Sequence, residues 1–551
     1  MKLKILLPIA VLIIVAIFFR FYNLDSVPPG LYPDEAMNGN NALEAISTAP
    51  PADGYKVFYP ENNGREGLFI NIQAFFLKIF GVREPWVLRS VSAIFGVLTV
   101  LGIYFLVLEV LRNGTRDTVY RAYRQAGEIR YTTIAFLSSF FVAISFWHIN
   151  FSRIGFRAIM APMFLTWALY FLIKSLNQAR NNLQLTTYNL QPESRKSLVV
   201  SWILIILSGL LYGLGMHSYI AYRGTPLLII FIYLFYWWIN KTEINFKKIF
   251  ASFLVFVVFA LIAFAPLGTY FVQNPQDFMG RTGQLSIFAS QTPLKDLGTN
   301  VLKTLAMFNI RGDGNWRHNY SGSPELFWLV GIFFILGTIS GLISLFKKSS
   351  SENQNTVYPA YRQAGGTRYT KFLFVVCLAW IAVAFLPVVI SNEGIPHALR
   401  SILMIPPVYI LAGMGGAYLV EFLLKKINKR IVFVFGSFIL LAMIAQSFVS
   451  YFVLWANNPN TASAFSQKYT DLGREINIIS DSIKKYVVVN AGGVDVRGVP
   501  MPAQTVMFLT DTFTPEKQKA RNIYYVSEEQ EKYLNTTDAL VFYLEERNDD
   551  N

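Results

Sequence analysis

The chain has 551 residues, and 53% of them are hydrophobic, with a mean hydropathy of +0.39. Soluble domains are typically less apolar, so the composition excludes an ordinary soluble protein and indicates a membrane protein with many crossings. The net charge of +14 does not indicate a nucleic-acid partner, because most basic residues lie in short segments between apolar runs. Cys377 is the only cysteine, which excludes an intrachain disulfide and a thiolate metal site.

Eleven apolar runs are long enough to cross roughly 30 Å of hydrocarbon as helices. The first follows the basic start of the chain and lacks a small-residue cleavage pattern, so we expect an uncleaved helix that begins in the cytoplasm. The expected crossings cover residues 5–19, 88–108, 133–150, 156–174, 198–216, 225–240, 249–271, 326–346, 372–390, 401–420 and 431–455.

This odd number of crossings assigns every loop to one side of the membrane. Lysines and arginines cluster in the loops that fall inside, whereas the outside loops are rich in Asp, Asn, Gly and Pro, as the positive-inside rule requires. Outside, we expect a first loop at 23–67, an interfacial helix at 68–80 and a long loop at 272–325. The sequence thus predicts a multi-pass protein of the cell membrane, with a transmembrane domain at residues 1–455.

Two segments, TVYRAYRQAGEIRYT at 118–132 and TVYPAYRQAGGTRYT at 356–370, differ at only three positions. Both fall in loops that are predicted to be cytoplasmic. Two copies this far apart do not form a solenoid, and surface loops tolerate insertions. We therefore interpret them as a duplicated insertion, with a cytoplasmic docking motif as the alternative.

The composition changes after Trp455, where the chain becomes polar. Helical spacing at 465–484 is followed by four strand-like runs, YVVVN, QTVMFLT, NIYYVS and ALVFYL, which are separated by turn residues. These features predict a small α/β domain at 456–551 on the outer side of the membrane. It contains no cluster of catalytic residue types, so we expect an accessory role.

Acidic, basic and histidine side chains gather in the outer loops. The first loop contains the adjacent acids Asp34 and Glu35 and, further on, the segment NNGREG. All four histidines of the chain also lie on the outer side. The candidate site residues are Asp34, Glu35, Arg65, Glu66, Arg153, Arg157, Arg223, Asp313, Trp316, Arg317, His318, His397 and Arg400.

Carboxylates beside fixed cations suit the transfer of a group from an anionic, lipid-linked donor. A polyprenyl-phosphate sugar offers a phosphate to arginine side chains, which bind its oxygens with a rigid pair of donors. Negative charge develops on this phosphate as the sugar leaves, and preorganised cations stabilise it. The acceptor hydroxyl is too weak an acid to ionise alone, so a carboxylate base must take its proton, and Asp34 is the candidate.

Each of these residues also has a purely structural interpretation. Asp34 could cap a helix that begins at Glu35, because aspartate is a common N-cap. Arginines at helix ends often reach toward lipid headgroups, and His or Trp in a long loop are common interfacial anchors. The gathering of all these residue types on one side favours a site for an anionic substrate.

Five segments in chain order support a family resemblance: PPGLYPDEA, NNGREGLFINIQAFFLKIFG, HINFSRIGFRAIMAP, MFNIRGDGNWRHN and GIPHALRSI. Together they resemble the bacterial branch of the dolichyl-phosphate-mannose protein mannosyltransferase family, which is related to the aminoarabinose transferase that modifies lipid A. The resemblance covers about residues 1–455, and neither the C-terminal tail nor the two near-identical segments takes part in it.

The resemblance implies a GT-C type fold and an inverting glycosyltransferase. Such an enzyme moves one sugar from a polyprenyl-phosphate donor to a hydroxyl of a protein, lipid or glycan on the outer face of the membrane. Asp34 matches the base or acceptor-positioning acid, with Glu35 beside it and Glu66 as a second acid of the loop. Gly67 occupies the place of a lysine that contacts the donor phosphate in the aminoarabinose enzyme, so other cations must do so here.

We expect the phosphate contacts and the acceptor contacts to come from different loops. The phosphate-binding candidates are Arg65, Arg153, Arg157, Arg223, His397 and Arg400, and the acceptor-loop candidates are Asp313, Trp316, Arg317 and His318. No tight cluster of metal ligands is evident in the sequence, so no metal site is predicted. Metal dependence varies within this fold, which leaves a divalent cation open as a cofactor.

Two other functions compete with this one. An oligosaccharyltransferase has the same type of fold but usually carries a Trp-Trp-Asp motif in its outer domain, whereas Trp237 and Trp238 are followed by Ile239 at the inner end of a predicted helix. A transporter or flippase for lipid-linked sugars normally buries ionisable residues near the bilayer midplane. Here the acids are concentrated in outer loops, which favours surface chemistry over translocation.

Overall fold

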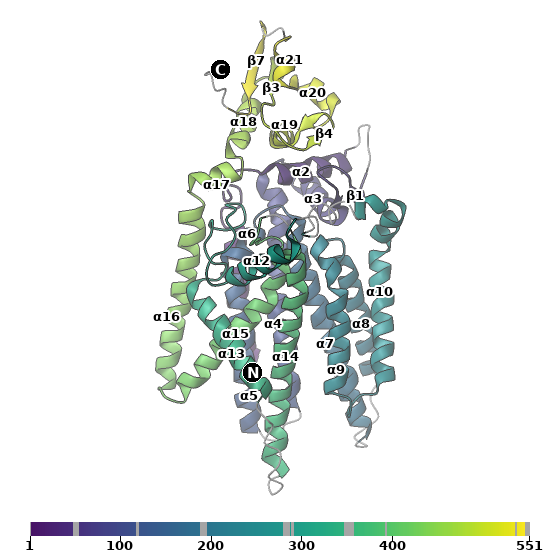
Figure 1. The fold of residues 1–551 in the computed structure, drawn as a ribbon, viewed down its shortest axis with the longest axis vertical. Helices are drawn as coiled ribbons and strands as arrows, with labels where there is room; N and C mark the ends of the chain where they lie inside the picture. The colour runs from purple at the N-terminus through teal and green to yellow at the C-terminus, as the bar shows by residue number, and fades with distance from the viewer. Residues whose placement is uncertain are drawn as a thin grey trace.

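The computed structural model describes residues 2–47, 54–116, 121–187, 195–278, 287, 291–346, 357–391, 394–534 and 537–545. A long bundle of helices forms most of the molecule, and a small domain of helices and strands lies at one end of it (Figure 1). The described part of the chain starts within the bundle and ends in the small domain (Figure 1).

Each of the eleven expected crossings overlaps a long helix. These helices are α1 (Lys2–Phe21), α4 (Pro85–Arg116), α5 (Arg121–Ala143), α7 (Met160–Thr187), α8 (Arg195–Gly215), α9 (Pro226–Ile239), α10 (Phe246–Gln273), α13 (Trp328–Phe346), α14 (Val357–Val389), α15 (Ile405–Leu424) and α16 (Lys429–Phe448). Within the described residues, nine helices are long and apolar enough to cross a membrane. The remaining two are α1, whose described apolar part is Leu6–Phe21, and α5.

Two details of the expected crossings are wrong. The run at 133–150 is not one helix, because α5 ends at Ala143 and a short helix, α6 (Phe146–Phe151), follows after a break. Ser145 caps α6, since its hydroxyl accepts a hydrogen bond from the backbone N–H of His148. The near-identical segments at 118–132 and 356–370 were expected in loops, but they are helical from Arg121 and Val357 onward as the first turns of α5 and α14.

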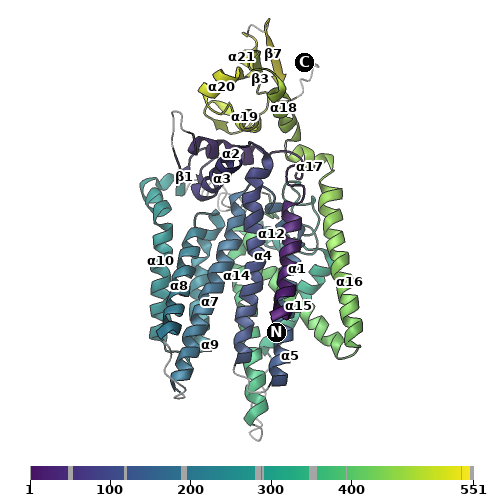
Figure 2. The ribbon, with the colours of Figure 1, turned by 180° about the vertical axis from the view of Figure 1, so that it is seen from behind.

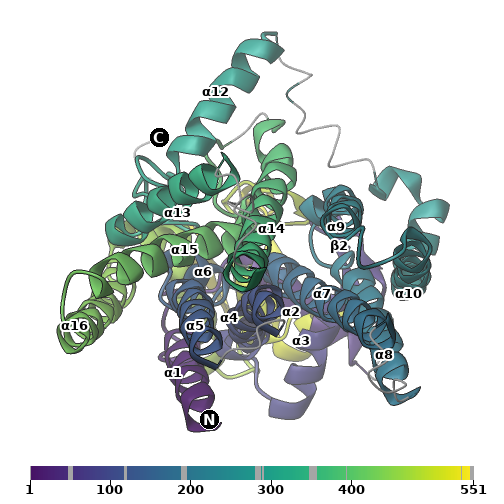
Figure 3. The same ribbon diagram turned by 90° about the horizontal axis from the view of Figure 1, so that it is seen from below.

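Viewed from below, the bundle has two groups of helices on either side of α4 and α5 (Figure 3). One group contains α7 to α10, and the other contains α13 to α16. The helices α13 and α15 pack closely at Gly337, where an added Cβ would lie 1.9 Å from the carbonyl oxygen of Leu411. Small residues of this kind let apolar helices approach each other inside a membrane.

Three helices lie across the bundle at the end nearest the small domain (Figure 2). They are α2 (Pro33–Ala45), α3 (Gly67–Phe80) and α12 (Pro293–Ala306). A short antiparallel pair, β1 (Phe58–Tyr59) and β2 (Arg65–Glu66), connects α2 to α3. The helix expected at 68–80 therefore exists as α3, and described residues of the loop expected at 23–67 form α2, β1 and β2.

The small domain is built around a three-stranded parallel sheet in the order β6-β3-β7. Its elements are α17 (Pro459–Ala464), α18 (Gln467–Ile478), β3 (Lys484–Val488), β4 (Asp495–Val496), β5 (Val499–Pro500), α19 (Gln504–Thr510), α20 (Pro515–Arg521), β6 (Ile523–Val526), α21 (Glu528–Glu531) and β7 (Ala539–Tyr543). The run QTVMFLT was expected to be a strand, but it forms α19. All seven of its residues are buried, and a short continuous apolar run does not distinguish a buried strand from a buried helix.

The small domain shares its hydrophobic core with α2. Met37 belongs to the same buried cluster as the sheet of the domain, and Phe508 belongs to the cluster of α2 and α3. Gly39 makes this contact possible, because an added Cβ would lie 2.5 Å from the ring of Phe508. Arg497 adds ion pairs to Glu44 at 2.8 Å and to Glu61 at 2.6 Å. The domain therefore fixes the helix that carries the adjacent acids.

Candidate functional site

Asp34 is in the first turn of α2, but it does not cap this helix. The helix begins at Pro33, and its N-cap is Tyr32, which has no side-chain capping bond. Proline suits the first helical position because its missing N–H has no partner there. The half-buried carboxylate of Asp34 accepts a hydrogen bond of 2.9 Å from the Nδ2 of Asn62. Its position is thus fixed by the NNGREG segment, and its role as a helix cap is not supported.

Glu35 lies in the interior, although we expected it beside Asp34 in the site. Its carboxylate is fully buried and pairs with Arg89, whose Nε is 3.1 Å from Oε2. The same oxygen accepts a hydrogen bond of 2.7 Å from the backbone N–H of Gly155. These contacts join α2, α4 and the segment after α6. The geometry gives Glu35 a structural role, which corrects its place among the catalytic candidates.

Arg65 connects β2 to the face of α2 that carries Asp34. Asp34, Asn38 and Asn41 follow one another at helical spacing, so they share this face. The guanidinium of Arg65 donates to Asn38 Oδ1 at 2.5 Å and to Asn41 Oδ1. Asn38 in turn donates to the carbonyl oxygen of Gly155 at 2.9 Å. Because Arg65 is only 2% exposed, it is a structural cation here, contrary to its expected contact with a phosphate.

Glu66 forms ion pairs with two arginines from distant parts of the chain. Its Oε2 lies 2.6 Å from Arg157 Nε, and its Oε1 lies 3.5 Å from Arg223 Nη2. Burial opposes ionisation of Glu66, but the charges of Arg157 and Arg223 outweigh it and hold the pKa of this carboxyl below its usual value. Two cations against one anion leave this cluster with a net charge of +1, which suits an anionic ligand.

Arg157 and Arg223 retain exposed surface, at 15% and 22% of their side chains. Arg157 begins the segment η1 (Arg157–Ile159), which directly precedes α7. Arg223 lies in η2 (Ile220–Gly224), which directly precedes α9. Arg223 also donates to the carbonyl oxygen of Phe278 at 2.9 Å. The phosphate-binding role expected for both residues is compatible with this position, and it stays a prediction.

Arg153 does not lie with these two arginines, although it is only four residues from Arg157. Its side chain is fully buried and donates to the carbonyl oxygens of Phe19, Tyr22, Asn23 and Val27, at 2.7–3.0 Å. The guanidinium also lies over the ring of Phe452, 4.9 Å from its centroid. Arg153 thus holds the end of α1 in place, and the expected phosphate contact is not supported.

The loop after α12 covers the start of α2. The guanidinium carbon of Arg317 lies over the ring of Tyr32, 3.9 Å from the ring centroid. Burial and the nearby charge of Asp34 raise the pKa of Tyr32, whereas Arg317 opposes this shift. The carbonyl oxygen of Trp316 accepts a hydrogen bond of 3.0 Å from Trp455 Nε1. This loop therefore brings a further cation to the vicinity of Asp34, and the acceptor-binding role of the loop stays a prediction.

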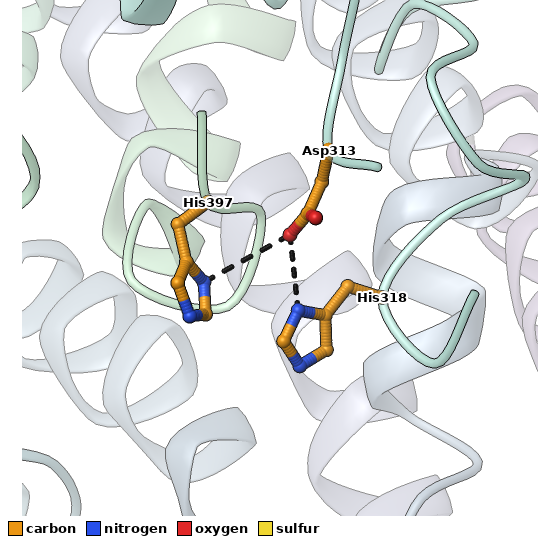
Figure 4. A group of neighbouring side chains, drawn as sticks. All are labelled: Asp313, His318 and His397. Carbon is orange, nitrogen blue, oxygen red and sulfur yellow. Dashed lines mark hydrogen bonds and ion pairs between the residues drawn. The ribbon is translucent and has the colours of Figure 1, made fainter. Parts of the chain in front are cut away.

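Two histidines, one from this loop and one from the loop after α14, converge on a carboxylate of this loop (Figure 4). Asp313 Oδ2 lies 3.0 Å from His318 Nδ1 and 3.9 Å from His397 Nδ1. Burial lowers the pKa of His318, and burial together with the charges of His318 and Arg400 lowers the pKa of His397 to about 3. Both imidazoles are therefore neutral near pH 7. Of the described residues, these three could hold a metal ion, a grouping that the sequence did not reveal.

Arg400 lies in the same loop as His397 and contacts the hydroxyl of Ser391. Its positive charge contributes to lowering the pKa of both His318 and His397. No ion pair or hydrogen bond connects Arg400 to the Glu66 cluster within the described chain. The structure thus separates the expected cations into a Glu66 group, an Asp313 group and two interior arginines.

Sequence reasoning missed Tyr32 and Arg89, and it gave no role to Asn62 of the NNGREG segment. Asn62 and its neighbour Asn63 both have positive φ values, of 53° and 60°. Asparagine tolerates this left-handed backbone better than most residues, so the tripeptide Asn-Asn-Gly was a recognisable signal for a tight turn. Nothing in the local sequence marks Arg89 as the partner of an acid 54 residues earlier.

No family model and no curated protein matches this chain. The solved structures that are similar to it at low sequence identity include the following three. An oligosaccharyltransferase of Archaeoglobus fulgidus, tethered to an acceptor peptide with the NVT sequon, is 13% identical with a TM-score of 0.46, over 95% of this chain and 64% of that one. The Pmt1-Pmt2 protein O-mannosyltransferase of S. cerevisiae, bound to the sugar donor, is 18% identical with a TM-score of 0.35, over 52% of this chain and 34% of that one.

The third structure, ArnT from Cupriavidus metallidurans in the apo state, is 12% identical with a TM-score of 0.42, over 98% of this chain and 89% of that one. The present chain spans less than two thirds of the length of the oligosaccharyltransferase and of the O-mannosyltransferase chain.

Proposed function

We propose that this protein is a membrane glycosyltransferase of GT-C type, which moves one sugar from a polyprenyl-phosphate donor to a hydroxyl acceptor. The observation that carries the proposal is the relation of Asp34 to the Glu66 cluster. Asp34 is a half-buried carboxylate that forms no ion pair with any described residue. Arg65, which donates to Asn38 on the helix of Asp34, is followed in the chain by Glu66, which pairs with two partly exposed arginines.

The reaction is a single displacement at the anomeric carbon. The acceptor oxygen forms a bond to this carbon as the bond to the phosphate oxygen breaks, which inverts the configuration. Asp34 takes the hydroxyl proton as the new bond forms. The phosphate leaves with the electron pair, and Arg157 and Arg223 stabilise the charge that develops on it.

Oligosaccharyl transfer is less well supported by the site. Trp237 and Trp238 are at the last turn of α9, whereas Arg223 precedes the first turn of this helix. A helix of 14 residues is about 21 Å long, so the tryptophan pair lies far from the Glu66 cluster. Transfer of a single sugar therefore remains the proposal.

The decisive experiment supplies membranes with a panel of radiolabelled polyprenyl-phosphate sugars. We expect one sugar to move to a protein, lipid or glycan, and no transfer by membranes that contain Asp34→Asn at the same expression level. Movement of a preassembled oligosaccharide would favour the oligosaccharyltransferase, and transport of the donor without a labelled product would favour a flippase. Either result overturns the proposal.

The site and the small domain are proposed to face the outside of the cell, with the N-terminus in the cytoplasm. Glu475 is exposed on α18, and Lys426 is exposed in the basic connection between α15 and α16. Cys377 is buried, so background labelling is expected to be low. An impermeant maleimide should label Glu475→Cys on intact cells and Lys426→Cys only after the membrane is opened. The reverse pattern would place Asp34 in the cytoplasm and contradict the mechanism.

A further inference from the structure

Two separate loops meet at Asp313, His318 and His397. Asp313 and His318 belong to the loop after α12, and His397 belongs to the loop after α14. We propose that these three side chains bind one zinc ion, which ties the two loops together at the end of the bundle that carries Asp34. The neighbouring glycosyl-transfer chemistry does not require this site, so the inference stands apart from the proposed function.

The ligand atoms have the spacing that such an ion needs. Zinc binds imidazole nitrogens and carboxylate oxygens at about 2.0–2.2 Å, which separates neighbouring ligands of a tetrahedral site by roughly 3.3 Å. Asp313 Oδ2 is 3.0 Å from His318 Nδ1 and 3.9 Å from His397 Nδ1, on either side of this value. All three ligand atoms lie within 4.8 Å of one another. Small side-chain rotations are therefore enough to accommodate the ion.

The orientation of the rings also points to a cation. Both imidazoles turn their Nδ1 atoms toward the same carboxylate oxygen (Figure 4). The backbone N–H of Arg400 lies 3.4 Å from His397 Nδ1. This nitrogen has one lone pair, so a metal ion bound there would replace this long hydrogen bond.

A second carboxyl group lies directly behind Asp313. Glu325 Oε1 accepts a hydrogen bond of 3.0 Å from the backbone N–H of Asp313. The other oxygen, Oε2, is buried and has no hydrogen-bond partner among the described residues. Outer carboxylates of this kind commonly support metal ligands.

The donor set selects the type of metal. Two imidazoles and one carboxylate suit zinc and similar transition metals, whereas calcium and magnesium prefer oxygen ligands alone. Asp313 Oδ2 already accepts a hydrogen bond of 2.9 Å from the backbone N–H of Ala398, so the two loops are held in register before the metal binds. The ion thus strengthens a connection that keeps Arg317 over Tyr32.

The test measures zinc in the full-length protein, purified in detergent with an affinity tag that contains no histidine. After equilibration with zinc and removal of unbound metal, we expect about one ion per chain by elemental analysis. His318→Ala and His397→Ala should each reduce this content at least about tenfold, because each removes one of three ligands. The control His217→Ala removes a histidine that contacts Ala263 instead of this cluster and should retain the ion.

Two further measurements keep the test independent of folding defects in the variants. Cobalt(II) added to the metal-free wild-type protein should give the visible absorption of a tetrahedral site, and zinc should abolish it. Zinc should also raise the melting temperature of the wild type but not that of His397→Gln, a variant that retains a polar side chain. The inference is overturned if the wild type binds no zinc, or if the His318 and His397 variants bind as much as the wild type. A wild-type protein that binds zinc but transfers no sugar would contradict the proposed function and leave the metal site supported.

Discussion

Sugar transfer is expected to fall by roughly 10²–10⁴-fold when Asp34 is replaced by asparagine, because the variant loses the base that accepts the hydroxyl proton. The amide keeps the shape of the carboxylate, and its oxygen can still accept the hydrogen bond from Asn62. The structure around the site should therefore be preserved. Donor affinity should change little, since Asp34 acts on the acceptor. Initial rates at saturating donor, together with donor binding, separate these two effects.

A matched control for this variant is Asp471→Asn on α18. Asp471 is an exposed acid on the same end of the molecule, and the change removes the same charge. Glu35→Gln is a poorer control than its position beside Asp34 suggests, because it leaves Arg89 buried without its anionic partner. An Asp34→Asn protein that folds, binds donor and transfers sugar at a near-normal rate would exclude Asp34 as the base.

Replacing Arg157 by alanine is expected to weaken donor binding by about 10–100-fold, which corresponds to about 1.5–3 kcal/mol for a hydrogen bond to a charged group. Its Nε contacts Glu66, which leaves the two terminal nitrogens to point elsewhere. The same variant should also slow transfer at saturating donor, because the charge on the phosphate grows in the transition state. Measuring KM and kcat separately distinguishes these two contributions.

Arg157→Lys tests the geometry of this contact. A lysine ammonium is a compact charge and cannot present the planar pair of donors that arginine offers to Glu66 and a phosphate together. We therefore expect Arg157→Lys to recover only part of the loss. Arg474→Ala is the control, because Arg474 is an exposed arginine on α18 that pairs with Asp25 and Glu84 at the surface. Normal donor affinity in Arg157→Ala would remove this residue from the phosphate site.

The long apolar runs were sufficient to predict the helices of the bundle. A membrane-spanning helix must satisfy its backbone internally and present about 20 apolar residues to the hydrocarbon, so its signal is contained in a continuous stretch of sequence. The positions of α3, β3, β6 and β7 were also predictable, because the apolar pattern of each is contained in a continuous stretch of sequence. Prediction was wrong at α19, where a buried apolar run fits a helix or a strand equally well.

The roles of the charged residues depended on contacts that no local pattern contains. Asp34 and Glu35 are adjacent, but successive helical residues point about 100° apart. Asp34 therefore meets Asn62, whereas Glu35 turns inward to Arg89. Arg153 and Arg157 are not on one helix, because Arg153 lies in the turn after α6 and Arg157 begins η1. Arg153 is therefore enclosed by carbonyl oxygens, whereas Arg157 reaches Glu66.

The sequence by itself determined that this protein is a membrane protein, where its helices are, and which loops carry acids, histidines and arginines. Only the tertiary structure decided which of these side chains meet. His397 reaches Asp313 across 84 residues, and Arg223 reaches Glu66 across 157. Hydropathy acts on each segment separately, whereas these contacts depend on how the helices pack against one another, and packing is a property of the whole chain.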